Sequence, residues 1–208
     1  MVGSGVPEDT TALVVDKALV AQLRQIFRIE EADLAAIREV REVLGVSLSK
    51  CSRESFEWIL SIPGTAAAVK DEKARQRALM AKEIHLRELV SGRLDEAYVR
   101  KCLQVGEAHE TLEVYPLWFL AHYAGYMVAI TRELAQVGST PPPDRLLAMR
   151  FALVKLLLLD IGLVWEAYYR RRARRIGEAY KALEIDHNPA LHIIEQRDKE
   201  IAELRTKL

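Results

Sequence analysis

The sequence predicts an all-α protein. Apolar residues recur at intervals of three and four along most of the chain, which is the period of an amphipathic helix, and they show no strand-like alternation. Glycine and proline number only 10 and 7 among 208 residues and gather at a few corners. Half of the residues are hydrophobic, which is enough for one ordinary domain with a buried core and an extension.

Three helices are predicted in the first third of the chain. Residues 16–28 and 31–44 each carry one apolar face, and residues 47–62 form a third helix that Pro63-Gly64 ends. Apolar side chains at helical spacing are expected to face a common core.

The middle of the chain contains a histidine among apolar neighbours. A helix over residues 71–90 precedes it, and the next helix carries His109 near its C-terminal end. Pro116 suits the first position of the following helix, 116–137, where its missing N–H costs nothing. A histidine in such surroundings is either a satisfied core residue or a haem ligand, and spacing alone does not decide between them.

The last third is predicted as two helices separated by breaks. The proline-rich run 138–143 ends the preceding helix, and a long helix is expected over residues 145–180. Asn188-Pro189 marks a second break, after which residues 191–208 show about two heptads, short for a coiled coil. Residues 1–15 are expected to be disordered.

Composition excludes several function classes. Thirty basic residues balance thirty acidic ones, so there is no electrostatic case for nucleic acid or an anionic membrane. The apolar run 146–165 is interrupted by Arg150, Lys155 and Asp160, which predicts a buried helix rather than membrane insertion. Two cysteines make no disulfide framework, which suits the reducing cytoplasm. No phosphate loop, paired Cys-x-x-Cys or His-Glu-x-x-His motif is present.

A family resemblance is carried by three motifs in order. Val105-Gly106-x-x-His109, followed by Pro116 and Trp118, resembles the proximal signature of the globin-coupled sensors, which are bacterial globin domains that regulate an output module. A second match, Ser91-Gly92-x-x-Asp95-x-x-Tyr98, lies ahead of the signature, and a third, the run Lys155–Leu163, lies far downstream of it. Together the three matches cover about residues 30–170.

The resemblance implies a globin fold with an extra N-terminal helix and a long C-terminal helix that leads to a short linker helix. It implies a sensor globin domain over residues 16–183 and a linker, 184–208, toward an output module absent from this chain. His109 would ligate the iron of haem b, and the chain would be a sensor rather than an enzyme.

The resemblance also implies which residues face the haem, and this chain departs from the family at two of them. The family often has tyrosine at the positions of Phe56 and Phe119, the first of which donates a hydrogen bond to bound dioxygen, so weak oxygen binding is expected. Lys82 and His85 remain as candidate distal partners or internal sixth ligands. The alternative for Lys82, which we favour, is that its stem lies over the haem edge with the ammonium in water or on a propionate, and the family often has a histidine at the position of His85 that does not ligate iron. The expected cofactor-binding residues are Phe56, Ala78, Ala81, Lys82, His85, Val105, Leu112, Trp118 and Phe119.

The expected ligand is a diatomic gas, O2, NO or CO, or else the site responds to redox state. A homodimer is expected through the helices 116–137 and 145–180, because their apolar residues exceed what one core needs. Two rival functions remain open from sequence: a haem-free globin-like signalling scaffold, and a haem enzyme that acts on nitric oxide or peroxide.

Overall fold

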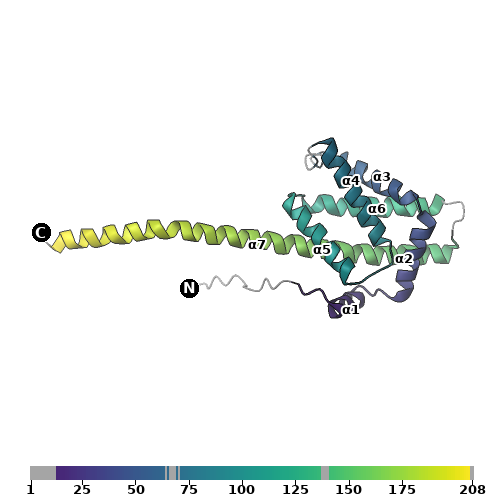
Figure 1. Cartoon of the computed structure of the whole chain (residues 1–208), viewed down its shortest axis with the longest axis horizontal. Helices are drawn as coiled ribbons and strands as arrows, with labels where there is room; N and C mark the ends of the chain where they lie inside the picture. The colour runs from purple at the N-terminus through teal and green to yellow at the C-terminus, as the bar shows by residue number, and fades with distance from the viewer. Residues whose placement is uncertain (1–12, 64, 66–68, 70, 137–140, 207–208) are drawn as a thin grey trace. The chain divides into compact units, whose positions relative to one another are not determined.

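The computed structural model describes residues 13–63, 65, 69, 71–136 and 141–206, with side chains beyond residue 183 described only at 196, 197 and 199. All regular structure in these ranges is helical (Figure 1), which confirms the all-α prediction. Residues 1–12 of the start that was expected to be disordered lie outside the described residues. Residues 138–140 of the predicted break also lie outside them. The helices are α1 (Lys17–Ile26), α2 (Glu31–Leu44), α3 (Ser47–Leu60), α4 (Glu72–Leu89), α5 (Glu96–Thr111), α6 (Pro116–Gln136) and α7 (Pro143–Thr206).

Side-chain caps fix where several helices begin. Asp16, Asp71 and Asp95 each accept a hydrogen bond from the backbone N–H three residues later, at 2.7–2.9 Å. These bonds satisfy N–H groups that have no partner inside the helix. Glu30 and Asp33 form a reciprocal capping box at the start of α2. The predicted helix starts therefore agree with the structure to within one or two residues.

The last helix differs from the prediction. α7 continues through Asn188-Pro189, where a break was expected. A proline inside a helix removes one hydrogen bond and crowds the preceding turn, but the helix can resume beyond it. The first compact unit of the chain ends at Tyr168, within α7, and the rest of this helix belongs to a second unit. The boundary expected at residues 183–184 remains a prediction.

Two glycines allow helices of the first unit to pack closely. A Cβ at Gly106 on α5 would lie 2.2 Å from the carbonyl oxygen of Val164 on α7. A Cβ at Gly125 on α6 would lie 2.6 Å from the Ser55 hydroxyl oxygen on α3. Real side chains do not approach so closely, so both crossings depend on glycine. α3 packs against both α4 and α6, and these close contacts build one continuous core.

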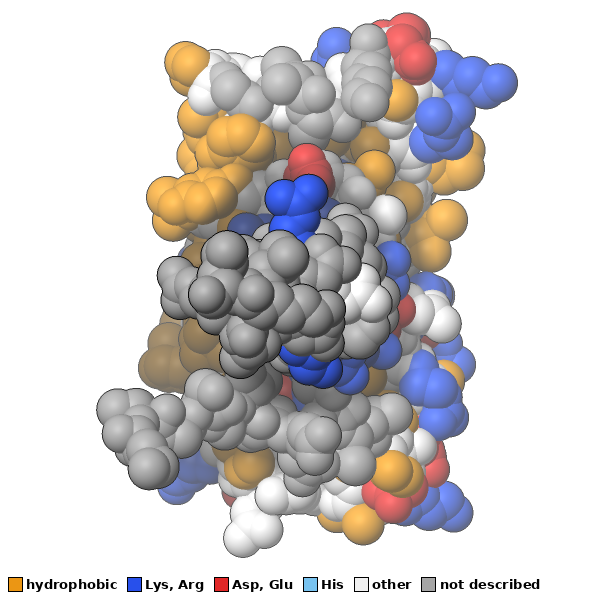
Figure 2. Space-filling model, turned by 90° about the vertical axis from the view of Figure 1, so that its left-hand side faces the viewer, with side chains coloured by type: hydrophobic (Ala, Val, Ile, Leu, Met, Phe, Trp, Pro, Cys, Tyr) orange, Lys and Arg blue, Asp and Glu red, His pale blue; other side chains and the backbone are white. Residues whose placement is uncertain are grey.

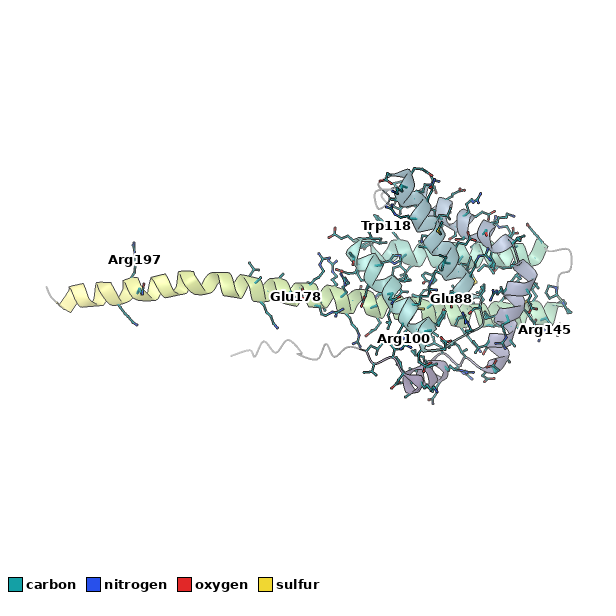
Figure 3. The ribbon with its side chains drawn as sticks, viewed as in Figure 1. Glu88, Arg100, Trp118, Arg145, Glu178 and Arg197 are labelled. Atoms are coloured by element: carbon teal, nitrogen blue, oxygen red, sulfur yellow. The ribbon has the colours of Figure 1, made fainter. Side chains whose placement is uncertain are left out.

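Ion pairs between elements lie mainly at the surface. Glu88 of α4 contacts both Arg93 and Lys101, at 3.0 and 3.2 Å, and Arg145 at the start of α7 pairs with Glu39 of α2. Glu88 and Arg145 are labelled in Figure 3. Exposed pairs of this kind contribute at most about 1 kcal/mol each. The fold therefore depends mainly on its apolar core.

Surface hydrophobicity is uneven. On the face shown in Figure 2, hydrophobic side chains gather along the left side, and Lys and Arg side chains are more frequent along the right. Among the described helices, none combines the length and the apolar character needed to cross a membrane.

Candidate functional site

A cavity of about 260 Å³ lies among α3, α4, α5 and α6. Its lining is largely apolar, and no acidic side chain occurs among the described residues that form it. The structure brings every predicted site residue to this one cavity: Phe56, Ala78, Ala81, Lys82, His85, Val105, His109, Leu112, Trp118 and Phe119.

The ring of His109 is held in one orientation. Its Nδ1 lies 2.7 Å from the backbone carbonyl oxygen of Val105, one turn earlier on α5. Because a carbonyl oxygen only accepts, Nδ1 carries the hydrogen and donates it, and Nε2 keeps a free lone pair. Burial, reinforced by the charge of Lys82, lowers the pKa of His109 to about 4. The imidazole is therefore neutral at neutral pH, as a metal ligand must be.

The corner after α5 shapes the side of the cavity next to His109. Glu113 has φ 54°, in the left-handed region that favours glycine, and Val114 donates its N–H to the carbonyl oxygen of His109 at 2.9 Å. α6 then begins at Pro116 and brings the Phe119 ring to 5.6 Å from the His109 ring, centroid to centroid. Leu112 is 66% exposed, so it lies at the rim of the cavity.

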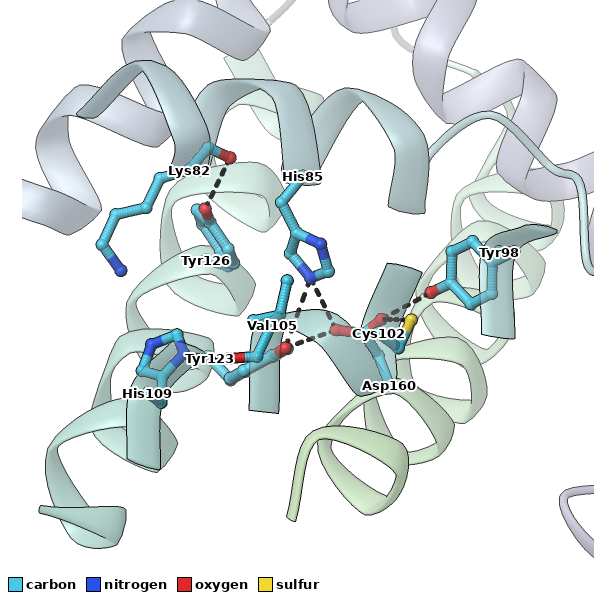
Figure 4. A network of polar contacts seen from close by, with 9 residues as sticks. All are labelled: Lys82, His85, Tyr98, Cys102, Val105, His109, Tyr123, Tyr126 and Asp160. Carbon is cyan, nitrogen blue, oxygen red and sulfur yellow. Dashed lines mark hydrogen bonds and ion pairs between the residues drawn. The ribbon is translucent and has the colours of Figure 1, made fainter. Parts of the chain in front are cut away.

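The two candidate distal residues on α4 have different environments. The Lys82 amine lies over the Phe56 ring, 5.7 Å from its centroid. His85 Nε2 instead lies 2.8 Å from Oδ2 of Asp160, on α7. Figure 4 shows Lys82 extending toward His109, while His85 points toward Asp160. The structure therefore distinguishes the two candidates: His85 is bonded to Asp160, whereas the Lys82 amine lies beside the Phe56 ring in the cavity.

Asp160 is the centre of a buried polar network. Its carboxylate is fully buried and accepts hydrogen bonds from α4, α5 and α6, and this network is drawn in Figure 4. Burial alone would raise the pKa of Asp160, but the positive charge and hydrogen bond of His85, with further hydrogen bonds, hold it at about 2. The donors are His85 Nε2, Tyr98 Oη and Cys102 Sγ, each at 2.8 Å, and Tyr123 Oη.

This network was not predicted from the sequence. Asp160 drew attention only as a charge that interrupts an apolar run, and its donors are 37 to 75 residues away in the chain. Burial and the neighbouring carboxylate raise the pKa of Tyr98, Cys102 and Tyr123, so all three keep their hydrogens and remain donors.

His122 is a second residue that was not assigned to the site from the sequence, where it was expected to be a surface or packing residue. It is 5% exposed and lines the cavity from α6. The Ser55 hydroxyl lies 3.1 Å from both His122 Nδ1 and the His122 carbonyl oxygen, while Nε2 is buried without a partner in the described part of the chain. Burial, with the charge of Lys82, lowers the pKa of His122 well below 6.5. Its spacing from Trp118 and Phe119, four and three residues, was the available signal.

The described residues contain no group of three or more histidine, cysteine, aspartate or glutamate side chains that would hold a metal ion by themselves. The site thus offers separate imidazoles, among which His109 is oriented by Val105, rather than a cage of ligands. That arrangement suits a metal whose other ligands come from a cofactor.

Comparisons with known proteins agree with this geometry. No match was found among curated proteins. The structure is similar to the globin domain of a Geobacter sulfurreducens globin-coupled sensor, with a TM-score of 0.65 and 17% sequence identity, over 72% of this chain and 97% of that one. This similarity confirms the globin fold. The sequence model of the Protoglobin family matches residues 16–174, so the chain belongs to the protoglobin family.

Proposed function

We propose that the chain is a haem-binding sensor globin in which His109 is the protein ligand of the iron. The observation that carries the proposal is the bond from His109 Nδ1 to the Val105 carbonyl, which leaves Nε2 as the free nitrogen of a ring in a largely apolar cavity. Family membership supports haem as the cofactor, and we assign it as haem b.

The residues present fit such a group. Val105 fixes the tautomer and orientation of His109, and Phe119 packs against its ring. The largely apolar lining of the cavity suits the apolar faces of a porphyrin. When bound, haem supplies an iron that coordinates a diatomic gas, and we infer that the gas or the redox state is the signal.

An absorption spectrum tests the proposed cofactor directly. The purified full-length chain, supplied with haem, is expected to show a Soret band with one haem per chain, and the ferrous protein is expected to bind carbon monoxide. A chain that retains no haem after the excess is removed is instead a haem-free scaffold, and the proposal is then wrong.

We also propose a homodimer through α6 and α7. Four apolar side chains on α7, Leu147, Phe151, Val154 and Leu158, are 38–59% exposed and recur at heptad spacing. Leu117 and Val128 on α6 are about 60% exposed. Surfaces of this kind are typical of interfaces. A four-helix bundle with C2 symmetry would bury them and pair the two C-terminal segments.

Light scattering at micromolar concentration tests the dimer. The expected mass is twice the chain mass of 23.6 kDa, and Phe151→Glu is expected to shift it toward the monomer because it places a charge in the interface. Met80→Glu is the matched control, since Met80 is similarly exposed (65%, against 59% for Phe151) but lies on α4. A wild-type monomer would overturn this prediction.

The signal is proposed to leave through the C-terminal part of α7 to an output domain or protein. Asp160 lies on α7 and binds side chains of the cavity wall, which gives this route a physical basis. The free buried thiols of Cys51 and Cys102 support a reducing compartment, and we infer that the protein is cytoplasmic.

A further inference from the structure

Lys82 presents to the cavity an ammonium group that has no counter-charge among the described residues. The charged residues that follow Lys82 on α4 include paired ones: Glu83 pairs with Arg87, and Glu88 with Lys101. No carboxylate of the described residues lies within 4.0 Å of Lys82 Nζ. A shielded ammonium is costly unless it is paired or hydrogen-bonded. The amine is therefore available to a partner that enters the cavity from outside.

The surroundings of Lys82 specify the charge of that partner. The cavity is lined by imidazoles of His85, His109 and His122, and those of His109 and His122 are held neutral. The carboxylate of Asp160 already accepts hydrogen bonds from four donors, one of which is His85. Burial lowers the pKa of Lys82 to about 8, so the amine remains mostly protonated at pH 7. His85 is paired with Asp160, so the charge of Lys82 is the one without a counter-charge among the described residues of the cavity, and it favours an anion.

We propose that Lys82 selects the ligand of this site: its ammonium donates a charge-assisted hydrogen bond to a small anionic ligand bound on the cavity side of His109. The class includes nitrite and azide. Dioxygen belongs with them because it becomes partly negative on binding iron, whereas carbon monoxide stays nearly neutral. This inference rests on the proposed haem site and adds a ligand class to it.

The inference changes the expectation for oxygen. From the sequence, Phe56 offers no hydrogen bond, and weak oxygen binding was expected. The Lys82 amine lies over the Phe56 ring, so a donor is present in that part of the cavity after all. A hydrogen bond to a charged group changes affinity by roughly ten- to a hundredfold. We therefore expect Lys82 to supply the donor that Phe56 lacks.

The test compares variants of the full-length, haem-loaded chain. Lys82→Met removes the charge and keeps the apolar stem, Lys82→Arg keeps a cation, and Lys73→Met is the control because Lys73 is exposed on the same helix. Azide and nitrite are titrated into the ferric protein, and the oxygen off-rate and carbon monoxide affinity are measured on the ferrous protein. Lys82→Met is expected to weaken both anions and to speed oxygen release by about ten- to a hundredfold.

The other measurements are expected to stay near the wild-type values. Carbon monoxide affinity is expected to change by less than about threefold, Lys82→Arg to retain most of the anion affinity, and Lys73→Met to match the wild type. Unchanged azide, nitrite and oxygen binding in Lys82→Met would overturn the inference alone.

Two further outcomes also overturn the inference. If Lys82→Met loses haem but the loaded fraction binds anions normally, the amine pairs with a haem carboxylate instead. If the ferric wild type is six-coordinate and low-spin, and becomes high-spin in Lys82→Met, the amine is itself an iron ligand. A wild-type chain that takes up no haem refutes the proposed function, and this inference with it.

Discussion

Stoichiometric haem binding is expected to be lost when His109 is replaced with alanine. Nε2 of this ring is the proposed bond to the iron, and its orientation is set by the 2.7 Å contact with the Val105 carbonyl. Removing this side chain removes the proposed bond between the protein and the iron. Addition of imidazole is expected to restore part of the Soret absorbance, because a free imidazole fits the space that the side chain vacates. Haem content per chain, measured with and without imidazole, checks this result.

His122→Ala is the matched control for the His109 variant. His122 lines the same cavity, and its Nε2 is also buried without a partner in the described chain. This variant is expected to keep one haem per chain, since Ser55 and Tyr126 position His122 as part of the wall. A wild-type spectrum in His109→Ala, together with haem loss in His122→Ala, would show that the ligand was assigned to the wrong helix.

Asp160→Asn is expected to lower the free energy of unfolding by about 3–5 kcal/mol. The Asp160 carboxylate accepts from four donors, whereas an asparagine amide has one oxygen and turns an NH2 group toward donors. Urea unfolding followed by circular dichroism measures the loss. Asp144→Asn on the same helix is the control, because Asp144 is exposed and should change stability by less than about 1 kcal/mol.

The effect of Asp160 also has a defined pH dependence. Its pKa is about 2 in the folded protein, below the value of about 3.9 for an unfolded aspartate. A lowered pKa stabilises the fold fully above the unfolded value, and that contribution is lost as pH falls toward 2. The stability gap between wild type and Asp160→Asn should therefore be constant near pH 6 and shrink below about pH 4. A gap that persists at pH 2 would mean that ionisation of Asp160 is not the cause.

Local signals predicted the helices and much of the cavity. The caps at Asp71 and Asp95 and the stop at Pro63 act within a few residues, so their effects can be inferred from sequence. The residues around His109 were placed by a family motif together with helical spacing. α7 is the exception, because whether Pro189 ends or only perturbs a helix depends on the balance of hydrogen bonds on both sides.

Long-range contacts account for what the sequence did not predict. Asp160 and His85 are 75 residues apart, and no local pattern shows that they share a hydrogen bond. That bond is what distinguishes His85 from Lys82, although both lie on the same part of α4. The direction of the flexible Lys82 side chain depends on contacts that the sequence does not show. These are the Phe56 ring beneath the amine and the absence of a described acidic side chain nearby.

The crossing at Gly106 brings the backbone of α5 against that of α7. Elsewhere, side chains between two helices can absorb a small displacement by changing rotamer. At this point the carbonyl of Val164 would lie only 2.2 Å from a Cβ on residue 106, so there is no room for a side chain between the two backbones. His109 is three residues further along α5. The contact with α7 is thus less than one helical turn from His109. A tilt of α5 at His109 is therefore expected to displace α7 directly, and the crossing couples the imidazole rigidly to α7.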